Sequence, residues 1–349
     1  MTREPTQPSR RVVLLGAAGG LLGAAGCGSG TTHTAPSPSA SSPSAPSLSA
    51  PSPSGTAPAG APTSPPPTTQ AAALPRTTPW RPTSAEITPA AKLRAVQLVE
   101  AIGAWPQGRG GAAAARTRVA ALRLPASLVA QAGPLLPDAD AAVVQVVDAQ
   151  YGGILTDSAS VLVVCRQWTL RGGRVGAGGT TVDVRLTRAA SGWTVTALHP
   201  ARPGAAVSPL PGRVRAILAD SRIELPPAAQ ADLRSGRIHD SVLTAMRQLA
   251  GTYRIYVSVV RSGHPLDVFG TSRPSDHPRG RAFDVWQIDG HAVVDPATPR
   301  GLIERFMRDA AAAGSYNVGG PVQLSGGATA NQFFSDNTHH DHVHIGFTG

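Results

Sequence analysis

From residue 86 onward, the pattern of apolar and polar positions predicts helices and strands in two successive groups. In the first group, 88–105 has apolar residues at helical spacing, and the Thr-Pro at its start is a helix-initiation signal. Three runs rich in β-branched residues follow, separated by glycine-containing turns, and they predict strands over 160–170, 180–189 and 192–200. We therefore expect a small α+β domain over 86–200, in which a helix precedes an antiparallel sheet.

The second group begins after 201–212, a segment rich in Pro, Gly and Ala that we interpret as a linker. The pattern beyond it predicts helices over 226–236, 240–251 and 298–314 and strands over 253–263, 281–289 and 341–347. Each predicted helix ends in Gly, which is a common helix stop. These elements predict that 213–349 is an α+β domain with helices to one side of an antiparallel sheet.

The 86–200 domain resembles the small cone-shaped domains of the NTF2-like type in its order of elements. It shows no paired acidic residues on one strand and no clustered histidines. We therefore expect it to bind an unidentified partner or to act as a spacer. Cys165 lies in an apolar run and is expected to be a small buried side chain.

The first 27 residues have the organisation of a bacterial signal peptide. A basic start precedes VVLLGAAGGLLGAAG, which is too short to cross a hydrocarbon core of roughly 30 Å. The run ends in AAGC, which resembles a lipobox with Cys27 as the lipid-bearing N-terminus, and SRRVVLL resembles a twin-arginine export signal. The alternative is an ordinary secretion signal with an incidental cysteine. We expect export and lipid anchoring on the outer face of the cytoplasmic membrane.

Residues 28–85 are rich in Pro, Ser, Ala and Thr and hold almost no charge. Such a composition cannot bury enough apolar surface to offset its ordering entropy, so it predicts a disordered tether. The net charge of +10 allows attraction to anionic polymers. For an exported lipoprotein, wall polymers and lipid head groups are better candidate partners than nucleic acid, and the tether would carry the domains into a cell wall.

Four of the ten histidines lie in the last eleven residues, in HHDHVHIGFTG. The period of two along a strand puts His342 and His344 on one face of 341–347, and it puts Asp284 on one face of 281–289. If the two strands are antiparallel neighbours, Asp284 and His344 face each other, with His277 approaching from a loop. Two imidazoles and one carboxylate suit a tetrahedral zinc site with one open position, as in catalytic zinc centres.

The pattern SDHPRGRAFD, followed by DHVH, resembles the metal-site signature of the M15 D,D-/L,D-carboxypeptidases and the related hedgehog-type zinc domain. The resemblance covers roughly the last 125 residues. It implies zinc ligands at His277, Asp284 and His344, a general base at Asp341, and a hydrogen-bonding role for His342 beside the reacting oxygen. It also implies metal-assisted hydrolysis of the short peptides of peptidoglycan.

The chain departs from that family in two places. It has RSGHP where members usually carry SGYR before the first zinc histidine, and the residue in the position of the general base is Asp341 where Glu is commoner, which shortens the reach. Arg261 or Arg273 could replace the missing arginine, and Ser275 is a further candidate for substrate binding. Two functions stay open, a zinc peptidase and a zinc-stabilised lipoprotein that binds wall peptide without cleaving it.

The other histidines are weaker candidates. No motif supports His264 or His291, His340 is expected to be a solvated loop residue, and His339 is a spare candidate base. Trp286 is expected either in the core or in the wall of a pocket.

Overall fold

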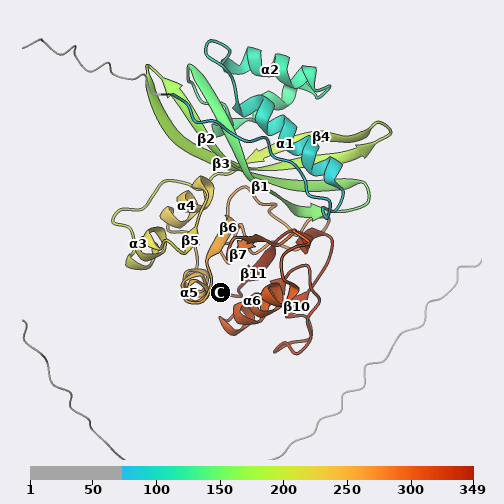
Figure 1. The fold of residues 1–349 in the computed structure, drawn as a ribbon, viewed down its shortest axis with the longest axis vertical. Coiled ribbons are helices and arrows are strands. Elements are labelled where there is room, and N and C mark those ends of the chain that lie inside the picture. The colour runs from blue at the N-terminus through green and yellow to red at the C-terminus, as the bar shows by residue number, and fades with distance from the viewer. Residues whose placement is uncertain (1–72) are drawn as a thin grey trace, which may run out of the picture. The chain divides into compact units, whose positions relative to one another are not determined.

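The computed structural model describes residues 73–349 (Figure 1). These residues belong to one compact unit. The predicted signal peptide, the predicted lipid-acceptor Cys27 and the predicted tether up to residue 72 lie outside the described residues. Over 73–349, no helix is both long and apolar enough to cross a membrane.

The segment before the first helix has no helix or strand, but it contacts the first sheet. The backbone N–H of Thr78 donates to Oε1 of Gln145 at 2.8 Å, and Nε2 of Gln145 donates to the Thr78 carbonyl at 2.9 Å. Trp80 packs against the apolar core of the same sheet. The packed part of the chain therefore begins before residue 86.

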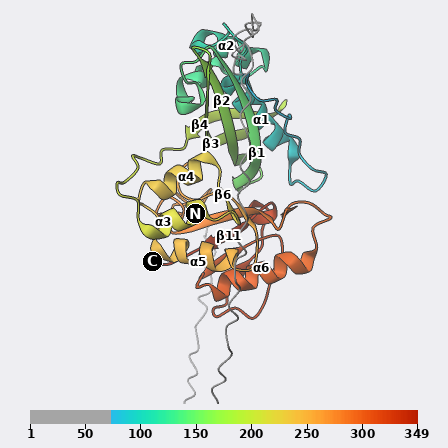
Figure 2. The ribbon, with the colours of Figure 1, turned by 60° about the vertical axis from the view of Figure 1, so that its left-hand side comes forward.

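The first part of the fold is a four-stranded antiparallel sheet with helices on one face (Figure 2). Its helices are α1 (Pro89–Gly103), α2 (Gly111–Ala121) and the 3-10 helices Ala126–Gln131 and Gly133–Leu135. Its strands, in spatial order, are β1 (Ala141–Ile154), β2 (Ser158–Arg171), β3 (Arg174–Ala189) and β4 (Gly192–Pro200). Helix α1 and strands β2, β3 and β4 confirm the predicted elements, whereas β1 and α2 are additional.

Strand β2 is buried on both faces, which explains its unbroken apolar sequence. Val161 and Val163 belong to the core that the sheet shares with α1. On the opposite face, Leu162 and Val164 pack against Val259 of the second sheet. The first sheet therefore lies between its own helices and the second part of the fold.

The second part contains a seven-stranded mixed sheet in the order β10-β9-β11-β7-β6-β5, with β8 paired to β7. Its strands are β5 (Ile223–Glu224), β6 (Ile255–Val259), β7 (Ala282–Ile288), β8 (His291–Ala292), β9 (Asn317–Gly319), β10 (Phe333–Phe334) and β11 (Val343–Gly346). The expected antiparallel pairing is correct for the β6-β7-β11-β9 centre, but β5 pairs with β6, and β10 with β9, in parallel. These parallel edge strands are two residues long, too short for a sequence pattern to reveal.

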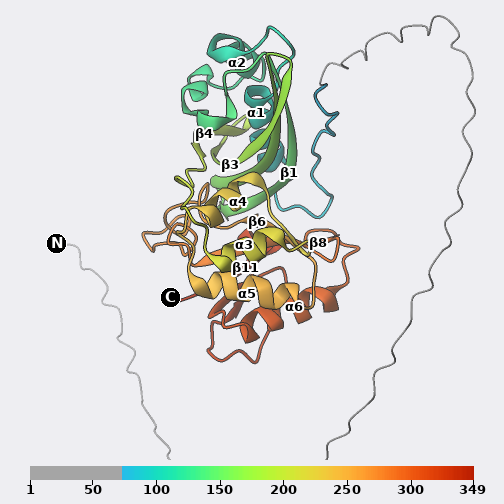
Figure 3. The same cartoon turned by 90° about the vertical axis from the view of Figure 1, so that its left-hand side faces the viewer.

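Four helices pack around this sheet. They are α3 (Gly212–Ala219), α4 (Pro227–Arg234), α5 (Asp240–Ala250) and α6 (Arg300–Ala312), and a 3-10 turn at Thr338–His340 precedes β11. Residues Phe283 and Val285 of β7 and Ile345 of β11 point into the core that α5 and α6 close. Figure 3 shows α5 and α6 on the side of β11 that faces away from β1. Because side chains alternate along a strand, Asp284 and His344 point the other way, toward the first sheet.

Candidate metal centre

His344 and Asp284 lie directly opposite each other in the antiparallel pairing of β11 with β7. Nδ1 of His344 is 3.0 Å from Oδ1 of Asp284, and both side chains are buried. This arrangement confirms the facing predicted from the alternation of the two strands. Directly opposed residues of an antiparallel pair are about 5 Å apart, which places their polar ends in direct contact.

His277 reaches the same point from the loop before β7. Its Nδ1 lies 2.8 Å from the carbonyl oxygen of Val260, while its Nε2 lies 3.0 Å from Oδ1 of Asp284 and 3.1 Å from Nδ1 of His344. Gly280 closes the loop with φ of 72°, and a Cβ there would lie 2.1 Å from the carbonyl oxygen of Arg237. The glycine is therefore required by the turn that brings His277 to the strand.

The three donor atoms fit a metal ion. The contact with Val260 requires the proton of a neutral His277 to be on Nδ1, so Nε2 presents a lone pair to the carboxylate of Asp284. Two acceptors 3.0 Å apart need a cation between them, either a proton or a metal. Tetrahedral zinc with bonds of 2.0–2.2 Å holds its ligand atoms about 3.3–3.6 Å apart, so the 3.0–3.1 Å spacing seen here would have to widen by only a few tenths of an ångström. His277, Asp284 and His344 could therefore hold one zinc ion.

His264 is a further donor that the sequence did not reveal. One donor atom from each of His264, His277 and Asp284 lies within 4.8 Å of the others, which is compatible with a shared metal ion. The His264 ring stacks on the His277 ring with centroids 4.1 Å apart and planes 18° apart. Burial, together with the neighbouring His277, lowers the pKa of His264 well below its usual value, so the ring is neutral. Only its position in the fold, stacked on another histidine, identifies His264 as part of the site.

Asp341 is buried, and its carboxylate contacts Lys92, Tyr151 and His342, none of which is a candidate metal ligand. Its Oδ2 accepts from Nζ of Lys92 at 2.5 Å and from the backbone N–H of Tyr151 at 3.1 Å, and its Oδ1 lies 2.6 Å from Nδ1 of His342. Burial alone would raise the pKa of this carboxyl, but Lys92 and His342 lower it to about 2. Asp341 is therefore ionised, and both of its oxygens are occupied by these partners.

His342 is the member of this pair that faces the metal ligands, with Nε2 3.8 Å from Oδ1 of Asp284. Burial would lower its pKa, but the carboxylates of Asp284 and Asp341 raise the pKa to about 9. At neutral pH His342 is therefore an imidazolium that presents an N–H donor. Burial lowers the pKa of His344 to about 4, which keeps that ring in the neutral form that binds metals.

Lys92 comes from α1 in the first part of the fold and is fully buried. Its Nζ also pairs with Oε2 of Glu86 and lies 5.0 Å from the centre of the Tyr151 ring. Burial opposes the charged form, but Asp341 and Glu86 raise the pKa of Lys92, so it is charged at neutral pH. The one sequence signal for this role is that Lys92 is the only lysine in a chain whose other basic residues are arginines.

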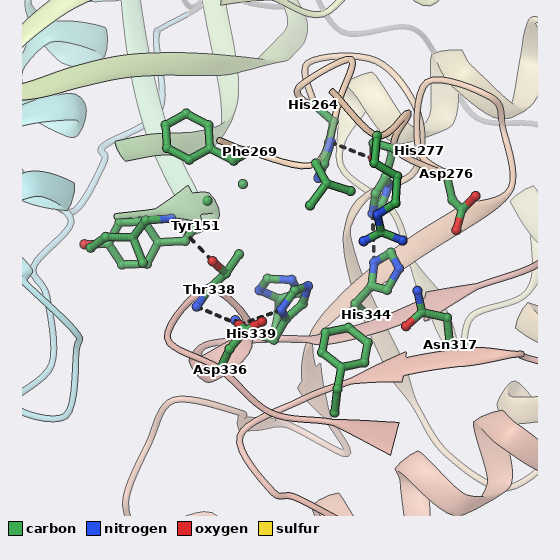
Figure 4. A pocket seen from close by; sticks show the side chains of 18 of the residues that line it. Tyr151, His264, Phe269, Asp276, His277, Asn317, Asp336, Thr338, His339 and His344 are labelled. Atoms are coloured by element: carbon green, nitrogen blue, oxygen red, sulfur yellow. Dashed lines mark hydrogen bonds and ion pairs between the residues drawn. The ribbon is translucent and has the colours of Figure 1, made fainter. Parts of the chain in front are cut away.

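A cavity of about 690 Å³ opens over the metal centre (Figure 4). Both parts of the fold line it: Tyr151 and Ile154 from β1, and His277, His339 and His344 from the second part. His339 lies in this wall with Nδ1 2.8 Å from Oδ1 of Asp336, so the spare candidate base is beside the site. Asp341 does not line the cavity, whereas His342 does.

The remaining candidates lie in different places. Arg273 and Ser275 line the cavity, whereas Arg261 lies away from it and donates to the carbonyls of Arg202 and Pro203. Arg261 therefore holds the 201–212 segment, and only the other two are placed to meet a ligand at the metal centre. Three further side chains lie outside the cavity wall: Trp286 is half-buried against Tyr256, His340 bonds the carbonyl of Ala85, and His291 is exposed.

No protein-family model, no curated protein and no solved structure matches this chain. Any assignment of function therefore rests on the geometry of this site and on the residues that form it. Fold similarity alone would in any case not establish an activity.

Proposed function

We propose that this protein is a zinc-dependent peptidase of the M15 type that cleaves peptidoglycan stem peptides or cross-bridges at the cell envelope. One observation carries the proposal: the donor atoms of His277, Asp284 and His344 converge within 3.0–3.1 Å beneath a cavity. Two histidines and one carboxylate are a donor set typical of catalytic zinc, which leaves a coordination position for substrate or water.

The fold of 213–349 supports the resemblance to the hedgehog and D-Ala-D-Ala-peptidase scaffold. The antiparallel strands β7 and β11 carry Asp284 and His344, and the loop before β7 carries His277. This placement is the one that the SxHxxGxAxD and DHVH motifs imply. The parallel strands β5 and β10 lie at the two edges of the sheet and do not alter the pairing of β7 with β11.

The chemistry would be hydrolysis of a peptide bond. Bound zinc would polarise the scissile carbonyl and activate a water molecule. His342 points an N–H at the centre and can donate to the carbonyl oxygen as negative charge develops there, or to the departing amine. Asp341 holds His342 through Nδ1, as a carboxylate orients an imidazole in other hydrolases. In this proposal Asp341 acts as a positioning residue through His342, and His339 with Asp336 is the candidate base in the cavity wall.

The cavity suits a short peptide. Its volume of about 690 Å³ lies within the range of roughly 300–1,000 Å³ that is usual for small-ligand sites. Arg273 in its wall could pair with a substrate carboxylate, which is the charge that stem peptides carry at their ends.

Export, lipidation at Cys27 and the tether would bring this cavity to the cell wall. In a Cys27→Ser variant, we expect loss from the membrane fraction or an uncleaved signal, and unchanged membrane partitioning would contradict the lipid anchor.

A second function is favoured by the burial of Asp341. Its oxygens are taken by Lys92, His342 and the N–H of Tyr151, so it offers no free base to the cavity. A zinc-stabilised lipoprotein that binds wall peptide without cleaving it would need no base. The two functions differ only in turnover, since both require the metal centre and the cavity.

Digestion of purified muropeptides separates them. The full-length chain is loaded with Zn²⁺ and incubated with muropeptides, bound zinc is measured, and product masses are recorded. A peptidase yields masses that correspond to loss of a terminal residue or to opening of a cross-bridge. Zinc binding with muropeptide retention and no new mass supports the binding lipoprotein. A chain that binds no zinc contradicts both.

A further inference from the structure

Among the described residues 73–349, Gln150 of β1 is the only residue of the first sheet whose side chain hydrogen-bonds a candidate metal ligand. Its Nε2 donates to Oδ2 of Asp284 at 2.7 Å, and the residue is fully buried. Its Oε1 accepts from the hydroxyl of Ser258 on β6. Because an ionised carboxylate only accepts hydrogen bonds, the nitrogen end of the amide must face Asp284, and the oxygen end then accepts from the Ser258 hydroxyl.

The shape of β1 explains how a residue of another sheet reaches this point. The pairing of β1 with β2 shifts register between Val146 and Asp148, and again between Tyr151 and Gly153. Such β-bulges bend a strand and redirect its side chains. Gln150 lies between the two irregularities, and its partner across the pair, Leu162, packs toward the second sheet. The strand is therefore bent where its side chain meets Asp284.

Asp284 uses its two oxygens differently. Oδ1 lies 3.0 Å from both His277 Nε2 and His344 Nδ1, at the point where the donor atoms meet. Oδ2 is bonded to Gln150. A carboxylate fixed through one oxygen presents the other in a single direction, and the partners that fix metal ligands in this way contribute substantially to metal affinity.

We propose that Gln150 is a positioning residue for Asp284, so that the first part of the fold is an integral part of the metal centre. This inference rests on the proposed function, because it takes Asp284 as a zinc ligand. It changes the expected role of 86–200 from a partner-binding or spacing module to a component of the site. The contacts of Lys92 and the Tyr151 N–H with Asp341 support it, since they come from the same part of the chain.

The test is the zinc affinity of Gln150→Leu in the full-length chain, measured by competition with a chromophoric chelator. Leucine keeps much of the volume and removes the donor. Loss of a group that orients a metal ligand typically weakens metal binding about 10- to 100-fold, and we expect that loss here. The readout is the dissociation constant for Zn²⁺ and does not depend on turnover.

Gln167→Leu is the matched control. Gln167 is a buried glutamine of the same sheet, and its Nε2 donates to the carbonyls of Gly103 and Leu135, away from the metal centre. Its loss should lower stability, as the loss of Gln150 does, while the zinc dissociation constant stays at the wild-type value. An equal weakening in both variants would mean that general destabilisation explains the effect, and it would overturn the proposal.

Ser258→Ala keeps the proposal testable if Gln150→Leu does not fold. This smaller change removes the hydroxyl that fixes the Gln150 amide, and a weakening of zinc binding smaller than that of Gln150→Leu is expected. Wild-type zinc affinity in a folded Gln150→Leu, or in Ser258→Ala if only that variant folds, would overturn the positioning role. Absence of zinc binding in the wild type would instead overturn the proposed function, which is a distinguishable result.

Discussion

Lys92 and Asp341 form a buried ion pair in which Nζ of the lysine lies 2.5 Å from Oδ2 of the carboxylate. Lys92 belongs to the first helix of the fold, and Asp341 lies two positions before the last strand. The pair therefore joins the first helix to the segment that enters the last strand. A buried ion pair is costly to break, because removal of one partner leaves the other charge without compensation.

Replacement of Lys92 by methionine should destabilise the protein strongly. Methionine fills much of the same space but leaves the Asp341 carboxylate buried without its cation. Breaking a buried pair in this way costs about 3–5 kcal/mol. Arg300→Met is the control, because Arg300 pairs with Glu304 on the exposed surface of α6, where such pairs contribute less than about 0.5 kcal/mol. Urea unfolding of both variants measures the difference, and equal stabilities would mean that the buried pair is not important for folding.

The metal ligands and Asp341 should separate by their effects on zinc. His277→Ala, Asp284→Ala and His344→Ala remove donor atoms, so each should lose both bound zinc and any hydrolysis of muropeptides. Asp341→Asn leaves the donors in place, although it removes the charge that pairs with Lys92 and should lower stability. It should keep the zinc and lower turnover about 100- to 10,000-fold, the usual range for loss of a group that assists proton transfer.

The control for this series is His291→Ala, which removes an exposed histidine of β8 and should change neither quantity. Zinc content is measured by elemental analysis after gel filtration, alongside the muropeptide digestion. Full zinc occupancy in His344→Ala would contradict the proposed site. Loss of zinc in Asp341→Asn would mean that this carboxylate contributes to metal binding and not only to chemistry.

Asp148 should make stability fall as the pH rises toward neutral. Burial and the nearby Asp341 raise its pKa to about 7, and its Oδ2 is buried without a hydrogen-bond partner. The folded state therefore holds a proton that the unfolded chain has lost above about pH 4. Stability from this group is complete below pH 4 and declines between about pH 4 and 7.

Asp148→Asn removes that titration. The variant should gain stability relative to wild type by about 1–4 kcal/mol on going from pH 4 to pH 8, given about 1.4 kcal/mol for each pKa unit. Urea unfolding of both proteins at the two pH values measures the change. A stability difference that is independent of pH would mean that Asp148 titrates normally in the folded state.

The candidate metal ligands could be predicted because they depend on local rules. Alternation along β7 and β11 determines which face of each strand carries Asp284 and His344. The antiparallel pairing of the two strands then places the two residues opposite each other. His264 and Gln150 could not be predicted in the same way. Gln150 and Asp284 are 134 positions apart in the chain, and His264 reaches His277 from a loop without regular structure, so no periodic pattern encodes either contact.

The sequence pattern also does not predict strand β1, because its polar residues form contacts with distant parts of the chain. Its sequence AAVVQVVDAQYGGI mixes apolar residues with Gln, Asp and Gly, so it lacks the strong strand pattern of β2. Two of its polar residues have partners outside the sheet: Gln145 bonds Thr78 before α1, and Gln150 bonds Asp284 in the second part of the fold. Tyr151 likewise uses its backbone N–H to bond Asp341. Gln150 therefore interrupts the apolar pattern of β1 at the position where the strand meets the candidate site.

Limited proteolysis tests whether the two parts of the fold depend on each other. Residues 204–209 are exposed and lie in a segment without regular structure, so a protease should cut there once the tether predicted from the sequence has been removed. The fragments should stay together under native conditions, because Leu162 and Val164 pack on Val259, and Gln150 and Lys92 bond Asp284 and Asp341 across the interface. Gel filtration of the nicked protein should therefore give one peak that contains both fragments and keeps its zinc. Two separate peaks, with zinc retained by the fragment that begins after residue 209, would mean that the second part folds and binds metal alone.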